Sequence, residues 1–142
     1  MTLHDRILTS KGLLTLGETP EGFDALVLAD IARASEAPVL HIARDDVRLN
    51  ALAEALVFFA PDLEVLRFPA WDCLPYDRVS PQSEVVAQRM ATLARLVLLG
   101  ESKKPIVVLA TVNAALQRVP PRQLLEEGAW GAAAGDRVDL DG

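Results

Sequence analysis

Four short apolar runs, each followed by a stretch with helical periodicity, constrain the fold of this 142-residue chain more than any other feature. Strands that alternate with helical segments are typical of βαβ units, in which the strands form a parallel sheet. We therefore predict an α/β domain in which at least four parallel strands carry helices on both faces. The expected strands are residues 12–17 (GLLTLG), 38–43 (PVLHIA), 63–68 (LEVLRF) and 105–110 (PIVVLA).

Two of the helical segments have clear start signals. Asp45 or Asp46 can cap the helix that follows the second apolar run, and Pro61 stops that helix. Thr111 can cap a short helix over residues 112–118 in the same way.

The two longest helices are expected to bury their large apolar side chains. One helix covers residues 21–34, and the other begins with Ser80 as its cap and Pro81 as its first residue, where a missing N–H is no loss. Helical residues three or four apart share a face. The predicted buried stripes are Phe23, Leu26, Val27 and Ile31 in the first helix, and Val86, Met90, Leu93 and Val97 in the second.

The segment from Gly17 to Asp24 has the glycine spacing of a phosphate-binding loop, GxxxxGK[ST], after an expected strand and before an expected helix. In such a loop a Lys neutralises the phosphates and a hydroxyl ligates Mg²⁺. Here Phe23 replaces the Lys, Asp24 replaces the hydroxyl, and two glutamates lie between Gly17 and Gly22. We expect no bound nucleotide or metal, and the simpler interpretation is that both glycines shape a tight turn.

Other catalytic patterns are equally weak in this sequence, and we predict no catalytic residue. His4 and His41 are the only imidazole groups, and His41 lies within an apolar run that favours a core role. Cys73 lies near Asp72 and Asp77, whose charges disfavour a thiolate. The two aspartates could form an acid/base pair, but turn-stabilising contacts are the simpler interpretation in a proline-rich loop.

The composition of the chain disfavours nucleic acid and membranes as partners. The net charge is -6 with Lys+Arg 14, so the clustered cations that hold a nucleic-acid backbone are missing. A single cysteine excludes an intrachain disulfide. With no signal-peptide pattern and no apolar run long enough for a membrane span, we expect a soluble cytoplasmic protein and no membrane partner.

Residues 68–93 (FPAWDCLPYDRVSPQSEVVAQRMATL) carry a specific signal. The segment closely resembles the N-terminal module of the bacterial transcription-repair coupling factors (Mfd), whose pattern is FPxW[DE]xLPYDxxSP followed by a helix with RxxxL. The matching residues are Phe68, Pro69, Trp71, Asp72, Leu74, Pro75, Tyr76, Asp77, Ser80, Pro81, Arg89 and Leu93.

This resemblance implies a domain of a large DNA-repair protein. Members of the family displace RNA polymerase stalled at a DNA lesion with an ATP-driven translocase, and they recruit the excision-repair protein UvrA. Their N-terminal region resembles part of the UvrB helicase but has no ATPase of its own. ATP, Mg²⁺, RNA polymerase and DNA would therefore bind to other domains of the parent protein, and this segment would contact those domains and UvrA.

The resemblance also suggests domain boundaries. Residues 1–11 would be an N-terminal extension, 12–127 a degenerate P-loop-like α/β domain, and 128–142 the truncated start of a β-rich domain that carries the main UvrA contacts. Trp71, Leu74 and Tyr76 are either a docking patch or a loop packed on the sheet edge. Two alternatives stay open: a noncanonical nucleotide-binding ATPase or helicase domain, and a DNA-binding module for damage verification.

Overall fold

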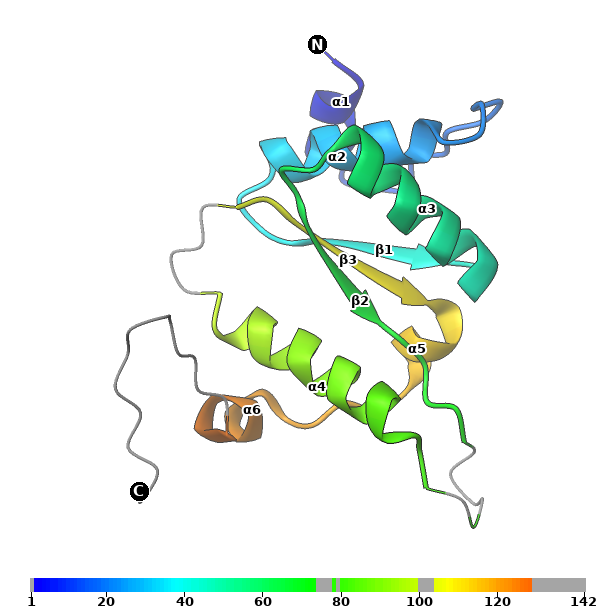
Figure 1. Cartoon of the computed structure of the whole chain (residues 1–142). Coiled ribbons are helices and arrows are strands. Elements are labelled where there is room, and N and C mark those ends of the chain that lie inside the picture. Colours follow the sequence, from blue (N-terminus) through cyan, green and yellow to red (C-terminus); the bar gives the residue numbers. More distant parts are fainter. Residues whose placement is uncertain (1, 74–77, 79, 100–103, 129–142) are drawn as a thin grey trace.

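A three-stranded parallel sheet organises the part of the chain that the computed structural model describes, which comprises residues 2–73, 78, 80–99 and 104–128. Its strands are β1 (Val39–Ala43), β2 (Glu64–Phe68) and β3 (Ile106–Thr111), in the order β1-β3-β2 (Figure 1). Both neighbouring pairs are parallel. The predicted α/β class is therefore confirmed, and the strand expected at 105–110 forms the centre of the sheet.

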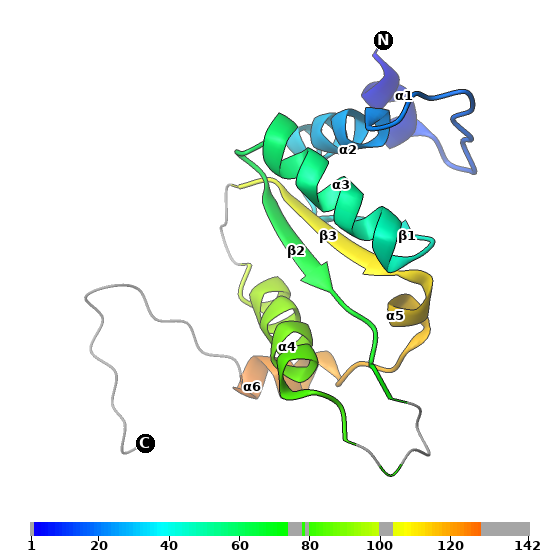
Figure 2. The ribbon, with the colours of Figure 1, turned by 45° about the vertical axis from the view of Figure 1, so that its right-hand side comes forward.

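Helices cover both faces of the sheet, as predicted. α2 (Phe23–Ala34) and α3 (Asp46–Phe59) pack on one face, where Val107 and Leu109 of β3 are fully buried. α4 (Ser83–Val97) lies on the other face, as Figure 2 shows. All six residues of β3 are buried, which explains why its sequence is an almost continuous apolar run rather than an alternating one.

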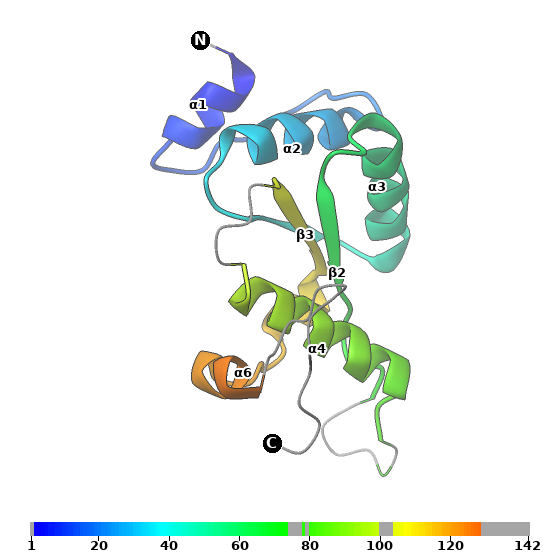
Figure 3. The same ribbon diagram turned by 60° about the vertical axis from the view of Figure 1, so that its left-hand side comes forward.

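Three shorter helices complete the described fold. α5 (Val112–Leu116) follows β3 directly, and α6 (Arg122–Gly128) packs against α4 (Figure 3). α1 (Leu3–Thr9) contacts α2 at the N-terminal end of the chain. No helix in these described ranges is long and apolar enough to cross a membrane.

The predicted helix caps before α3 and α5 are confirmed. The Arg48 N–H donates to Asp45 Oδ1 at 2.9 Å, and the Ala114 N–H donates to Thr111 Oγ1 at 3.3 Å. Each side chain satisfies a backbone donor that the first turn of a helix leaves without a partner.

The strand predicted at residues 12–17 is wrong. These residues have no regular secondary structure and are exposed, with Leu13 at 97%. A parallel strand is stable only where neighbours satisfy its backbone and helices cover its side chains. This segment has neither, so the described part of the sheet has three strands rather than the predicted four or more.

The predicted start of α4 is also wrong. α4 begins at Ser83, with Gln82 as its N-cap, rather than at Pro81 with Ser80 as the cap. The Gln82 N–H instead points to the carboxylate of Asp72, 3.3 Å from both oxygens. A partner ten residues earlier in the sequence thus replaces the expected local cap.

The stripe predicted for α2 is a third correction. α2 buries mainly alanines, because their small size lets it lie close to α3 and the sheet: the buried residues are Ala25, Leu28, Ala29 and Ala32. Of the four large residues expected in the core, Leu26 is exposed and the other three are half-buried.

Candidate functional site: a buried arginine under the motif loop

Arg89 is the centre of the motif residues. It lies on the sheet-facing side of α4, is 1% exposed, and is the largest fully buried side chain. Its guanidinium carbon is 4.1 Å from the ring centroid of Phe68 and 4.4 Å from that of Trp71. A cation at these distances over aromatic rings is attracted by their negative faces.

The Arg89 guanidinium also joins three segments by hydrogen bonds. Nη1 donates to the Pro69 carbonyl at 2.6 Å and to Gln117 Oε1 at 3.3 Å, and Nη2 donates to the Arg118 carbonyl at 3.5 Å. Gln117 Oε1 in turn accepts from the Trp71 N–H at 2.7 Å. We call this arrangement of Phe68, Trp71, Arg89 and Gln117 the arginine clamp.

The three acceptors of Arg89 are neutral oxygens. Burial lowers the pKa of the Arg89 guanidinium, but an arginine starts so far above neutral pH that it stays charged. The clamp therefore holds a buried cation through ring faces and carbonyl dipoles. Because breaking such contacts leaves a charge without solvation, the clamp resists rearrangement.

Two more polar residues extend the inner face of α4. Thr92 Oγ1 donates to the Arg67 carbonyl at 2.7 Å, and Arg95 donates to both carboxylate oxygens of Glu64 at 2.7 Å. Arg89, Thr92 and Arg95 follow one another at a spacing of three, so they share one face.

The buried stripe predicted for this helix is therefore wrong in part. Met90 is 39% exposed, whereas Leu93 packs against the core as predicted, together with Leu96. Val86 and Val97 are half-buried.

The structure brings together part of the predicted motif. Phe68, Pro69, Trp71 and Arg89 meet in the clamp, and Asp72 lies at the start of α4. Ser80 is exposed and Pro81 is half-buried. Leu74, Pro75, Tyr76 and Asp77 lie outside the described residues. For Trp71, the packed alternative is the one that the contacts support.

Gln117, Thr92 and Arg95 were not identified from the sequence. The spacing of three polar residues on α4 was an available signal for the latter two, whereas Gln117 joins the clamp only through the tertiary fold.

The first turn of α2 contains the Asp24 carboxylate. The Ala25 N–H donates to Asp24 Oδ1 at 3.0 Å, and Arg48 Nη2 is 3.9 Å from Asp24 Oδ2. Gly22 is the N-cap with a φ of 81°, which glycine adopts readily. Gly17 is exposed and follows no strand, so the interpretation that both glycines shape a strand-to-helix turn is wrong for Gly17.

A crevice of about 410 Å³ lies beside this helix end, at the carboxyl end of β1. His41, Arg44, Arg48 and Asp24 line it. Burial lowers the pKa of His41, and the nearby Asp24 carboxylate opposes that shift. His41 is half-buried on β1 and lines this crevice, and it is not a member of the hydrophobic core clusters.

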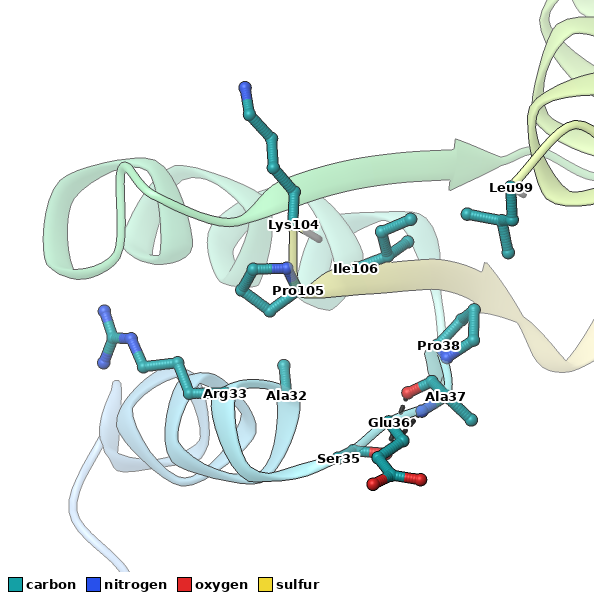
Figure 4. A pocket seen from close by; sticks show the side chains of 10 residues that line it. All are labelled: Ala32, Arg33, Ser35, Glu36, Ala37, Pro38, Leu99, Lys104, Pro105 and Ile106. Atoms are coloured by element: carbon teal, nitrogen blue, oxygen red, sulfur yellow. Dashed lines mark hydrogen bonds between the residues drawn. The ribbon is translucent and has the colours of Figure 1, made fainter. Parts of the chain in front are cut away.

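Another cavity of about 380 Å³ lies at the opposite, amino end of the strands (Figure 4). The charged ends of Arg33, Glu36 and Lys104 point away from one another there. Ligand sites in parallel α/β proteins lie at the carboxyl ends of the strands and contain converging polar groups. This cavity meets neither condition.

The fold defines a parallel α/β domain. Its arginine clamp is a buried polar cluster that links α4 to two other segments of the chain. Curated relatives are all transcription-repair-coupling factors: that of Escherichia coli is 31% identical over 126 residues, covering 89% of this chain, and that of Myxococcus xanthus is 34% identical over 123 residues, covering 81%. The Haemophilus influenzae protein is 29% identical over 129 residues, covering 89%. The chain belongs to the transcription-repair coupling factor family.

The match covers only a small part of each relative. The chain spans 11% of the Haemophilus influenzae protein and 10% of the other two. No family model matches the chain, and no solved structure gives a significant match.

Proposed function

We propose that this chain is a non-catalytic scaffold and docking domain, corresponding to the N-terminal UvrB-like module of a cytoplasmic transcription-repair coupling factor. In that proposal the full-length protein displaces stalled RNA polymerase at DNA lesions and recruits UvrA. The observation that supports the proposal most directly is the arginine clamp, in which the Arg89 guanidinium is buried against Phe68, Trp71 and the Pro69 carbonyl. The clamp fixes Phe68, Pro69 and Trp71 at the end of β2 and just after it, which favours a structural role for these three residues.

The arrangement at the α2 N-terminus supports the non-catalytic part of the proposal. The Asp24 carboxylate accepts a backbone N–H in the first turn of α2 and contributes a negative charge there. Two charges at about 4 Å interact by roughly 1–4 kcal/mol in partly screened surroundings, so this carboxylate opposes a polyphosphate. ATP and Mg²⁺ would bind to motor domains elsewhere in the parent protein.

The charge of the chain favours protein partners over nucleic acid. A net charge of -6 repels a phosphate backbone, and three of the arginines contact other groups of the domain: Arg33 with Asp62, Arg95 with Glu64, and Arg89 in the clamp. The expected partners of this region are the other domains of the parent and UvrA, and DNA would bind elsewhere.

Titration of purified UvrA tests the docking role. This chain is compared with a longer one that continues through the following β-rich domain. We expect the longer chain to bind and this chain to bind more weakly or not at all. If neither chain binds UvrA, the recruitment role is refuted.

Calorimetry with ATP and Mg²⁺ tests the non-catalytic part separately. We expect no binding heat. A dissociation constant in the micromolar range would favour the nucleotide-binding alternative instead. A salt-dependent mobility shift on damaged duplex would likewise favour the damage-verification alternative.

A further inference from the structure

α3 has apolar side chains on two opposite faces. The inward face buries Leu49, Leu52, Ala53 and Leu56 against the sheet and α2. On the outward face, Val47 is 78% exposed and Phe58 is 79% exposed. Exposed apolar side chains on the side opposite a buried face can mark a second contact surface.

The outward residues form one line along the helix, which we call the α3 outer stripe: Val47, Ala51, Glu54 and Phe58. Their spacings of four, three and four residues keep them on one face. Figure 2 shows α3 on the outside of the domain, with the sheet behind it. Among the described elements, none lies over this stripe.

The end of the stripe has the features of an interface centre. The rings of Phe58 and Phe59 meet edge to face, with centroids 5.0 Å apart and an interplanar angle of 88°. This contact favours the observed orientation of the Phe58 ring. Nearer the start of α3, Arg67 donates to Asn50 at 3.0 Å, so a satisfied polar pair borders the stripe there. An apolar centre with a polar rim is the usual anatomy of a protein interface.

The single charge in the stripe indicates what covers it. Glu54 lies between Val47 and Phe58, which are separated by about 16 Å along the axis at a rise of about 1.5 Å per residue. If two copies paired in antiparallel fashion, with Val47 against Phe58, the two Glu54 residues would be offset by only about 4–5 Å along the axis. Two like charges at nearly the same level on facing helices repel, whereas a Lys or Arg at that level would pair with Glu54. The stripe therefore fits a basic partner better than a second copy of itself.

We propose that the α3 outer stripe is a docking surface for a helix with two apolar anchors about 16 Å apart and a Lys or Arg between them. The helix belongs to another region of the same full-length coupling factor, an assignment that rests on the proposed function. The chain spans about a tenth of its relatives, which leaves ample sequence to supply such a helix. Small Ala51 lets the two helices approach closely, and the cation pairs with Glu54.

Hydroxyl-radical footprinting tests this inference. Oxidation of Val47 and Phe58 is measured in this chain and in the full-length coupling factor that contains it. We expect both residues to react freely in the chain alone and to be protected several-fold in the full-length protein. Glu54→Lys should remove the protection, whereas Glu36→Lys, a charge reversal at an exposed loop residue, should leave it.

Equal reactivity in the chain and the full-length protein would overturn the inference. So would protection that appears in this chain alone as its concentration rises, because that result assigns the stripe to a second copy. Protection that survives Glu54→Lys would refute the proposal that the partner helix carries a Lys or Arg against Glu54. The UvrA titration decides the recruitment role separately: protection without UvrA binding would leave the stripe assigned and refute recruitment.

Discussion

Replacing Arg89 by Met should destabilise the domain more than any surface arginine substitution. Met is apolar and flexible enough to fill most of the space, so the change removes mainly the guanidinium. Each cation–π contact contributes about 0.5–2 kcal/mol. The short bond to the Pro69 carbonyl contributes about 1.5–3 kcal/mol as a hydrogen bond from a charged donor.

These contributions are partly offset, because burying the cation costs free energy that Met does not require. We expect a net loss of about 3 kcal/mol, which is within the range for breaking a buried polar network. For a chain of this size, a loss of about 3 kcal/mol lowers the melting temperature by roughly 10 °C. The free energy of unfolding of Arg89→Lys should lie between those of Arg89→Met and the wild type. An ammonium keeps the charge but cannot stack as a planar group between two rings.

Urea unfolding measured by far-UV circular dichroism gives the free energy, and near-UV circular dichroism reports the packing of Trp71. Arg44→Met is the matched control, because the Arg44 side chain is 84% exposed. It should change stability by no more than about 0.5 kcal/mol. If Arg89→Met is as stable as Arg44→Met, the clamp does not stabilise the loop and the reasoning fails.

Three further predictions concern single residues. Thr92→Val should cost about 1–2 kcal/mol in urea unfolding, because it leaves the Arg67 carbonyl without its 2.7 Å partner. Burial lowers the pKa of His41 below its unfolded value near 6.5, so its stabilising contribution is present above about pH 6.5 and lost as the pH falls through the lower folded pKa. The loss of stability between about pH 7 and 5 should therefore shrink in His41→Leu but persist in His4→Gln, and equal slopes would contradict this. Gly22→Ala should lower the unfolding free energy by roughly 1 kcal/mol, because its φ of 81° strains any residue with a Cβ, and an unchanged melting temperature would exclude strain there.

The features that were predictable from the sequence are those with local causes. β3 is buried on both faces, so its residues form an apolar run that stands out without any tertiary information. Asp45 and Thr111 contact backbone donors three residues ahead, and such caps are visible as residue types at fixed positions.

The features that were mispredicted depend on distant partners. Residues 12–17 have the composition of a strand, but strand formation also needs an edge to pair with, and composition carries no information on that edge. The N–H of Gln82, the N-cap of α4, donates to Asp72 ten residues earlier, and the local Ser-Pro signal carries no information on such a partner. α2 buries alanines because α3 packs close to it. The spacing of large apolar residues along α2 carries no information on that packing.

The inner face of α4 shows why a motif can be identified before its role is understood. Arg89 was part of the family pattern, but hydrophobicity places an arginine on the solvent side of a helix. Only the fold shows that Phe68 and Trp71 supply the two ring faces between which a guanidinium can be buried. The aromatic residues before α4 and the arginine within it are therefore one structural unit, and substitution of either ring should weaken the same contacts as substitution of Arg89.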